Sequence, residues 1–130
     1  MQYDQFVGQV QNRARLASSG EAVGAIRATL QTLGEHLFGG EAENVAAQLP
    51  PELGIYLLEG VPADGFSLKE FFQRVSAREG VDLPIATYHT RVVMEILEEA
   101  VSPGLMGKVR DQFPAEYDQL FRSGSRGKMA

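Results

Sequence analysis

Residues 22–37 read AVGAIRATLQTLGEHL, and residues 86–101 read ATYHTRVVMEILEEAV. In both stretches apolar side chains recur at intervals of three and four residues, which is the spacing of one face of an α-helix. A shift of 64 residues superposes the two stretches. Extended to residues 20–60, the same shift makes ten of 41 positions identical, among them Arg27 with Arg91 and Glu35 with Glu99. The pair predicts one long amphipathic helix in each half of the chain.

Signals for helix starts surround both stretches. Ser18 with Glu21, and Ser67 with Glu70, have the spacing of capping boxes. Prolines stand where a first helical turn tolerates them, at residues 51, 84 and 103. Residues 60–65 contain the turn formers of a connector, and no segment alternates with a period of two. These signals predict a medium helix, a long helix and two short helices in each half.

The repetition predicts an all-α protein made of two similar halves, about residues 1–60 and 66–124. A unit of about sixty residues buries too little surface to be robust alone, so we expect an internally duplicated helical bundle with one shared core. Residues 1–124 are expected to form a single domain with pseudo-twofold symmetry. Residues 125–130 contain basic but no acidic side chains, and are expected to be a flexible basic tail.

Composition excludes several classes of protein. The 130 residues include no cysteine, so disulfides, thiolate metal sites and cysteine nucleophiles are impossible. The apolar runs are too short to cross a membrane, and the first residues lack the pattern of a signal peptide, so we expect a soluble, cytoplasmic protein. Residues 1–121 carry nine basic and seventeen acidic side chains, a net charge of −8. This charge repels phosphate, and we expect no binding to nucleic acid.

Three segments resemble one bacterial family. They are residues 37–53, residues 86–97 and residues 112–121, and all three are similar to the domain of unknown function 2267 (DUF2267). The resemblance spans residues 1–122 and implies a small, soluble, all-helical bacterial protein. It implies no activity, substrate or catalytic residue. Gly54-Ile55 departs from the charged helix former expected there, which makes this helix unusually apolar.

No constellation of catalytic or metal-binding residues emerges from the spacing. His36 and His89 lie near the edges of the two long apolar faces, and neither is repeated in the other half. We interpret each as a partly buried helix histidine with one hydrogen bond, and a titrating or ligating role as the alternative. Glu95, Glu98 and Glu99 fit a solvated helix face, since no histidine follows a glutamate by three residues. The sequence therefore predicts no catalytic residue, metal or cofactor, and favours a protein that is not an enzyme.

Arg27 and Arg91 occupy matched positions. Each could tie its long helix to a neighbouring helix end or carboxylate. Alternatively, both could flank an anionic ligand in a cleft between the halves, together with Tyr88 and His89. This second reading predicts a small-molecule binding protein or an unrecognised enzyme. Gly24 and Gly34, within the same helix as Arg27, are expected to allow close helix approach.

One short segment carries more apolar residues than a short helix can bury. Residues 55–58 read IYLL and Val61 follows soon after. We expect part of this set to contact another surface, and name Ile55, Tyr56, Leu58 and Val61 as candidates. The leading hypothesis is therefore a non-enzymatic protein-interaction or adaptor module, with self-association as one form of that role.

Overall fold

The computed structural model describes residues 1–124, apart from the side chain of Ser123. Within this range the chain forms eight α-helices and one short 3-10 helix, and no strand. The first half contains α1 (Tyr3–Arg13), α2 (Ser19–His36), α3 (Glu41–Ala47) and α4 (Pro51–Glu59). The second half contains α5 (Leu68–Glu79), α6 (Leu83–Ala100), α7 (Pro103–Asp111), η1 (Ala115–Tyr117) and α8 (Asp118–Ser123). The predicted all-α class is confirmed. The predicted tail, residues 125–130, lies outside the described residues.

Serine side chains begin three of the helices. The hydroxyl oxygens of Ser18, Ser67 and Ser102 accept hydrogen bonds from backbone N–H groups three residues later. These bonds satisfy donors that a helix leaves free in its first turn. The serine side of the capping boxes predicted at Ser18 and Ser67 is confirmed, whereas Glu21 accepts from the Ala17 N–H and Glu70 bonds to Arg74. The helix expected from Pro84 begins one residue earlier, at Leu83, with Asp82 as its N-cap residue.

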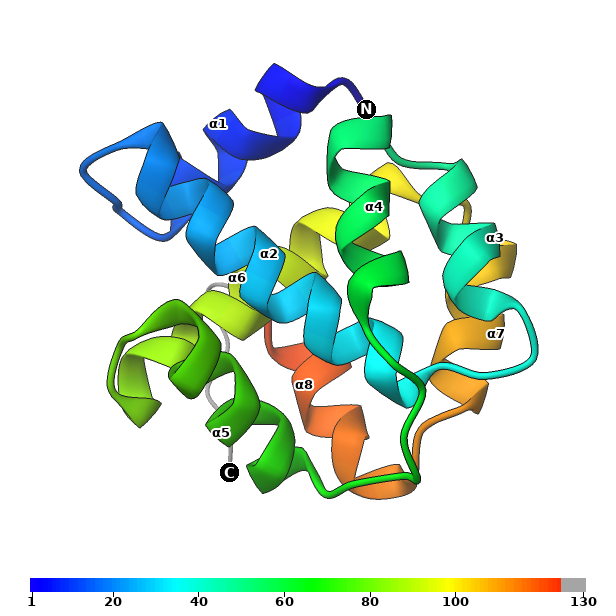
Figure 1. The fold of residues 1–130 in the computed structure, drawn as a ribbon. Coiled ribbons are helices and arrows are strands. Elements are labelled where there is room, and N and C mark those ends of the chain that lie inside the picture. Colours follow the sequence, from blue (N-terminus) through cyan, green and yellow to red (C-terminus); the bar gives the residue numbers. More distant parts are fainter. Residues whose placement is uncertain (125–130) are drawn as a thin grey trace.

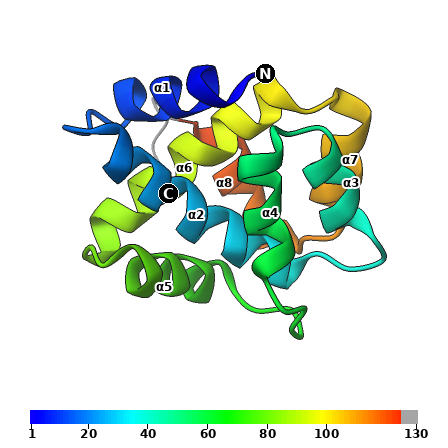
Figure 2. The ribbon, with the colours of Figure 1, turned by 45° about the horizontal axis from the view of Figure 1, so that its top comes forward.

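Two long helices, α2 and α6, form the centre of the molecule. Helix α5 packs against both of them, and α1 packs against the same two helices (Figures 1 and 2). Helix α4 lies on α2, α8 lies on α6, and α3 and α7 are neighbours at one end. Each half therefore contributes a helix that covers the long helix of the other half.

Buried apolar side chains from both halves form one cluster. The largest of those with almost no exposed surface come from α1, α2, α4, α5, α6, η1 and the turn after α2, and are Phe6, Ile26, Leu30, Leu33, Leu37, Leu53, Leu57, Phe71, Met94, Ile96, Leu97 and Tyr117. Removal of this surface from water supplies the main favourable contribution to folding. The helices of the two halves consequently depend on one another for burial.

Contacts between the halves recur at matched positions. The bounds of α6 are those of α2 displaced by 64 residues. Gln112 bonds to the backbone of Phe38 twice, as acceptor from its N–H and as donor to its carbonyl, each at 2.9 Å. Gln48 bonds to Ser102 in a similar way. It accepts from the Ser102 N–H at 2.8 Å, but it donates to the Ser102 hydroxyl, at 3.3 Å, rather than to a backbone carbonyl. Each glutamine thus fastens its half to the turn after the long helix of the other half.

The two glycines of α2 differ in their surroundings. A Cβ added to Gly34 would overlap the backbone carbonyl of Leu57, so α2 and α4 approach closely there, as predicted. A Cβ added to Gly24 would meet nothing within 4 Å, and the predicted close approach at Gly24 is wrong. No helix of the described range combines the length and hydropathy needed to cross a membrane.

Candidate functional site

His36, the last residue of α2, lies in an aromatic cluster. Its ring stacks on Phe113 with centroids 4.0 Å apart, and the rings of Phe66 and Tyr117 meet it edge-on at 5.0 and 5.2 Å. The residue is 5% exposed. Neither ring nitrogen has a hydrogen-bond partner in the structure. His36 thus lacks a hydrogen bond of regular geometry of the kind predicted, although the carbonyls of His36 and Phe66 lie near its ring.

Burial decides the charge of this imidazole. Loss of hydration lowers the pKa of His36 below its ordinary value, and the nearby Arg74 guanidinium lowers it further. The carbonyl groups of His36 and Phe66 act in the opposite direction and only reduce this effect. A neutral imidazole carries one N–H donor and one acceptor lone pair. His36 therefore offers one of each to whatever lies beside it.

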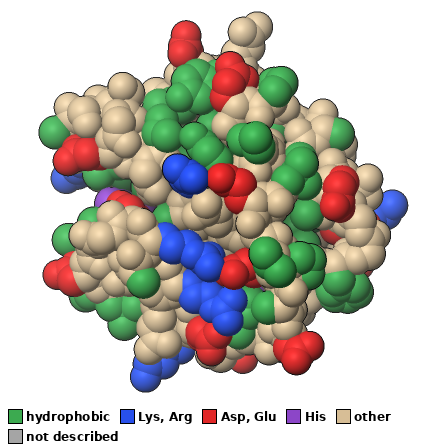
Figure 3. Space-filling model, viewed as in Figure 1, with side chains coloured by type: hydrophobic (Ala, Val, Ile, Leu, Met, Phe, Trp, Pro, Cys, Tyr) green, Lys and Arg blue, Asp and Glu red, His purple; other side chains and the backbone are tan. Residues whose placement is uncertain are grey.

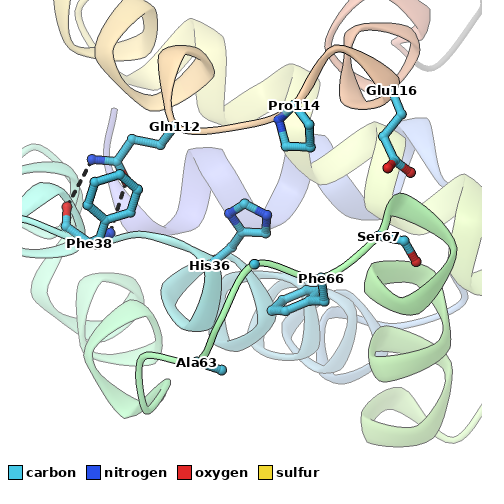
Figure 4. Close-up of a pocket in the computed structure, with 9 residues that line it drawn as sticks. His36, Phe38, Ala63, Phe66, Ser67, Gln112, Pro114 and Glu116 are labelled. Atoms are coloured by element: carbon cyan, nitrogen blue, oxygen red, sulfur yellow. Dashed lines mark hydrogen bonds between the residues drawn. The ribbon is translucent and has the colours of Figure 1, made fainter.

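A pocket of about 380 Å³ opens beside His36 (Figure 4). One wall comes from the turn after α2 and the connector that precedes α5, and the other from the segment that joins α7 to η1. The lining residues are His36, Phe38, Ala63, Gly65, Phe66, Ser67, Gln112, Pro114 and Glu116. The two halves of the chain therefore build this pocket together.

Hydrogen bonds hold the walls in place. Gln112 fixes the backbone of Phe38, as the dashed lines of Figure 4 show. An oxygen of Glu116 accepts from the N–H of Leu68 at 2.9 Å, which ties η1 to the start of α5. The Tyr117 hydroxyl donates to the Phe66 carbonyl at 2.6 Å. Burial, followed by the charges of Glu116 and Glu70, raises the pKa of Tyr117, which keeps this donor protonated.

Charged side chains surround the pocket, but none of them pairs with His36. The Arg74 guanidinium lies over the Phe66 ring, 3.9 Å from its centroid, and pairs with Glu70 and Glu35. Arg78 also pairs with Glu35. Figure 3 shows basic and acidic side chains side by side at the lower centre of this face. The one charged side chain in the lining is Glu116. The pocket therefore presents aromatic walls, an uncharged imidazole and a carboxylate.

A second pocket is lined by residues of the first half that match part of the His36 pocket lining. Its volume is about 410 Å³, and its lining includes Met1, Gln2, Gln48, Pro50 and Glu52. These residues stand 64 or 65 positions before Phe66, Ser67, Gln112, Pro114 and Glu116 of the His36 pocket. The position that matches His36 holds Ala100. Of these two matched pockets, only one contains an imidazole.

The four residues predicted to bind a ligand do not line the His36 pocket. Arg27 pairs with Glu59 of α4 at 3.0 Å and covers the Tyr56 ring, so it ties α2 to a neighbouring helix as one reading predicted. Two of the Arg91 nitrogens, Nε and Nη2, are buried and have no hydrogen-bond partner. The two matched arginines therefore differ in their contacts, because Arg27 forms an ion pair and Arg91 has two buried nitrogens without a partner among the described residues.

Tyr88 and His89 lie close together on α6. Their ring centroids are 6.4 Å apart. The Tyr88 hydroxyl donates to the backbone carbonyl of Arg13 at 2.8 Å, which joins α6 to α1. His89 Nδ1 lies 2.5 Å from a carboxylate oxygen of Glu79, so the predicted single hydrogen bond holds for His89. His89 also lines a separate hollow between the two halves, of about 630 Å³.

Of the three glutamates of α6, Glu99 is exposed as predicted, whereas Glu95 and Glu98 are half-buried. Glu95 and Glu99 pair with Arg13, and Glu98 pairs with Arg110. The hydrogen bond and charge of Arg13 lower the pKa of Glu99, while burial raises the pKa of Glu98. Across residues 1–124 no group of three or more histidine or carboxylate side chains is placed to hold a metal ion.

The apolar residues of α4 divide into buried and exposed positions. Leu53 and Leu57 are in the core, whereas Ile55, Leu58 and Val61 are 56%, 51% and 75% exposed. Tyr56, the fourth predicted contact residue, is half-buried beneath Arg27. Three of the four residues are therefore available on the surface.

Sequence reasoning missed the His36 pocket because its aromatic walls come from distant segments. His36, Phe66 and Phe113 belong to three separate parts of the chain, and helical periodicity says nothing about which of them meet. The signal that could have indicated it is the imbalance between matched positions, where His36 and the ring that stacks on it, Phe113, stand against Ala100 and Leu49.

A family model described as "Uncharacterized conserved protein (DUF2267)" matches residues 3–120. The match covers nearly the whole chain and agrees with the resemblance noted in the sequence. No curated protein matches the sequence.

Proposed function

We propose a function for this chain, which belongs to the family of uncharacterized conserved proteins DUF2267. It acts as a small-molecule binding protein without catalytic activity, and its ligand occupies the His36 pocket between the two halves. This site lies between the two halves, as the small-molecule hypothesis from the sequence expected. Its lining contains none of the four residues that the hypothesis named.

The unpartnered imidazole of His36 carries this proposal. Buried polar side chains are almost always hydrogen-bonded, and a buried donor or acceptor without a partner costs about 1–3 kcal/mol. His36 bears this cost at two nitrogens while its ring lines a pocket. A ligand that bonds to those nitrogens would recover the lost free energy on binding.

The lining indicates an uncharged, planar ligand. Phe38, Phe66 and Pro114 offer apolar surface, and the neutral imidazole can donate one hydrogen bond and accept another. An amide or hydroxyl group on an aromatic ring satisfies both requirements. Glu116 disfavours an anion, and the ring nitrogens of His36 contact neither a nucleophile nor a carboxylate that would make it a general base.

Titration with three matched compounds tests the proposal. Benzamide is uncharged, benzoate is its anionic relative and benzylamine is its cationic relative. We expect benzamide to cause saturable shifts of the backbone amide signals of Gly65 and Gln112, and benzoate to cause far smaller ones. His36→Phe keeps the aromatic stack but removes both nitrogens, and should abolish the benzamide response.

The matched glutamines supply a control for wall geometry. Gln112→Ala releases the Phe38 backbone and should weaken benzamide binding, whereas Gln48→Ala removes the corresponding bonds of the other pocket and should not. A protein that shows no saturable response to benzamide, or an undiminished response in folded His36→Phe, contradicts the proposal.

The exposed face of α4 favours a second function, a protein-interaction or adaptor module. Ile55 and Leu58 lie one helical turn apart, and Val61 follows the helix. Capture from native lysate on immobilised protein, compared with Ile55→Glu and Leu58→Glu, tests it. A stoichiometric partner, or untagged copies of this chain, lost in both folded variants supports the module, and equal capture by all three proteins opposes it.

We also propose that the two halves arose by internal duplication. Matched bounds of α2 and α6, matched glutamine bonds and two matched pockets support this origin. Divergence after duplication then explains why His36 stands in one pocket and Ala100 in the place that matches it.

A further inference from the structure

Glu79, the last residue of α5, has a carboxylate that its protein surroundings satisfy only in part. Its side chain is 7% exposed, and that of His89 beside it is 6% exposed. One carboxylate oxygen, Oε2, contacts His89 Nδ1. The other oxygen, Oε1, is buried and has no hydrogen-bond partner in the structure. A buried carboxylate oxygen in this condition requires a donor.

This carboxylate lines the 630 Å³ hollow between the two halves. The lining comes from the turn before α2, the first turns of α2, and the turn from α5 to α6: Leu16, Ser18, Gly20, Glu21, Gly24, Glu79, Val81, Ile85 and His89. Figure 3 shows this hollow as a notch at the left edge, with histidine and acidic atoms inside. It lies apart from the His36 pocket and shares no lining residue with it.

Acidic residues outnumber basic residues in the lining of this hollow. Glu21 and Glu79 are the two acidic residues, and His89 is the one basic group. The hollow therefore attracts a cation and repels the anion that Arg27 and Arg91 suggested, neither of which lines it.

Apolar side chains line the hollow as well as carboxylates. Leu16, Val81 and Ile85 line the same hollow, and Ile85 is 46% exposed. Gly20 and Gly24 present no side chain, and a Cβ added to Gly24 would enter open space. The hollow thus combines the unpartnered Glu79 Oε1 acceptor, two acidic residues and an aliphatic wall in a volume of about 630 Å³.

We propose that this hollow is a binding site for a primary alkylamine in its ammonium form. The ammonium group donates a hydrogen bond to Glu79 Oε1, and the alkyl chain lies against Leu16, Val81 and Ile85. Glu21 adds attraction, while its own Oε2 accepts from the Ala17 N–H at 2.9 Å. The inference does not rest on the function proposed for the His36 pocket.

Isoamylamine, isoamyl alcohol and isovalerate test this assignment, because they share an alkyl group and differ in charge. We expect saturable shifts of the Gly20 and Gly24 amide signals with the amine, at least a tenfold weaker response to the alcohol, and no saturation with isovalerate. The Gly65 amide, in the other pocket, serves as an internal control and should not follow the amine curve.

Two variants act by different means. Glu79→Gln keeps the shape of the side chain but removes its charge, and should weaken amine binding at least tenfold. Gly24→Leu fills the hollow from a position with free space, leaves both carboxylates in place and should abolish binding while the protein stays folded. Equal binding of amine and alcohol, no saturation with the amine, or full binding by folded Gly24→Leu would overturn the inference.

Discussion

At the scale of single residues, His36 and His89 show how far context decides the role of a side chain. Both are helix histidines near the edge of an apolar face, and the sequence gives them the same expectation. His89 meets Glu79 and forms one hydrogen bond, whereas His36 meets Phe66, Phe113 and Tyr117 and forms none. Their neighbours come from other elements, so sequence spacing could not distinguish them.

The lowered pKa of His36 predicts a pH dependence of stability. The unfolded chain binds a proton at an ordinary histidine pKa of about 6.5, and the folded chain resists protonation until a lower pH. The unfolded state therefore binds more protons as pH falls below about 6.5, and the free energy of unfolding falls with it. Urea unfolding between pH 7.5 and 5 should show this loss, with a slope of at most about 1.4 kcal/mol per pH unit from this group.

His36→Phe isolates that contribution, because the other titratable groups remain. The variant should lose less stability than the original protein over the same pH interval. Identical pH dependence of the two proteins would show that the His36 imidazole is not excluded from water.

At the scale of elements, helix starts were predictable and helix contacts were not. Ser18, Ser67 and Ser102 act through bonds to residues three positions on, so the local sequence contains the whole cause. Gly24 and Gly34 occupy the same helix and look alike in sequence. Only the position of α4 makes Gly34 a point of close approach and leaves Gly24 open.

The two glycines predict opposite effects of the same substitution. Gly34→Ala forces α2 away from the Leu57 carbonyl and should lower the free energy of unfolding by about 2–3 kcal/mol. Gly24→Ala meets no atom and should raise it by about 0.5–1 kcal/mol, because alanine loses less backbone entropy in a helix. Chemical denaturation of both variants measures the pair, and equal effects would contradict the packing of α4 on α2.

At the scale of the whole molecule, the repetition in sequence predicted the order of the helices better than it predicted the sites. The lengths and order of elements recur, and one core joins both halves. The His36 pocket and the Glu79 hollow each contain residues that the matched position does not repeat, His36 in the first and Glu79 with His89 in the second. Matched positions direct attention to Arg27 and Arg91, which line neither hollow, although matched residues such as Gln112 line the His36 pocket.

The shared core predicts that half of the chain does not fold alone. Helix α5 covers α2, and α1 covers α6, so residues 1–62 by themselves expose the face of α2 that α5 buries. A fragment of that size also buries a smaller share of its surface than the full chain does. We expect circular dichroism of residues 1–62 to show no cooperative thermal transition, while the full chain shows one. A sharp transition in the fragment would mean that each half has its own core.

The most direct test of the central claim is a long-range nitrogen–proton NMR spectrum of the histidine rings, recorded without and with benzamide. The His36 pocket predicts a neutral ring at pH 7 whose two nitrogen signals move saturably as benzamide binds, while those of His89 stay in place. A His36 ring that is charged at pH 7, or whose nitrogen signals ignore benzamide at every concentration, would contradict the account.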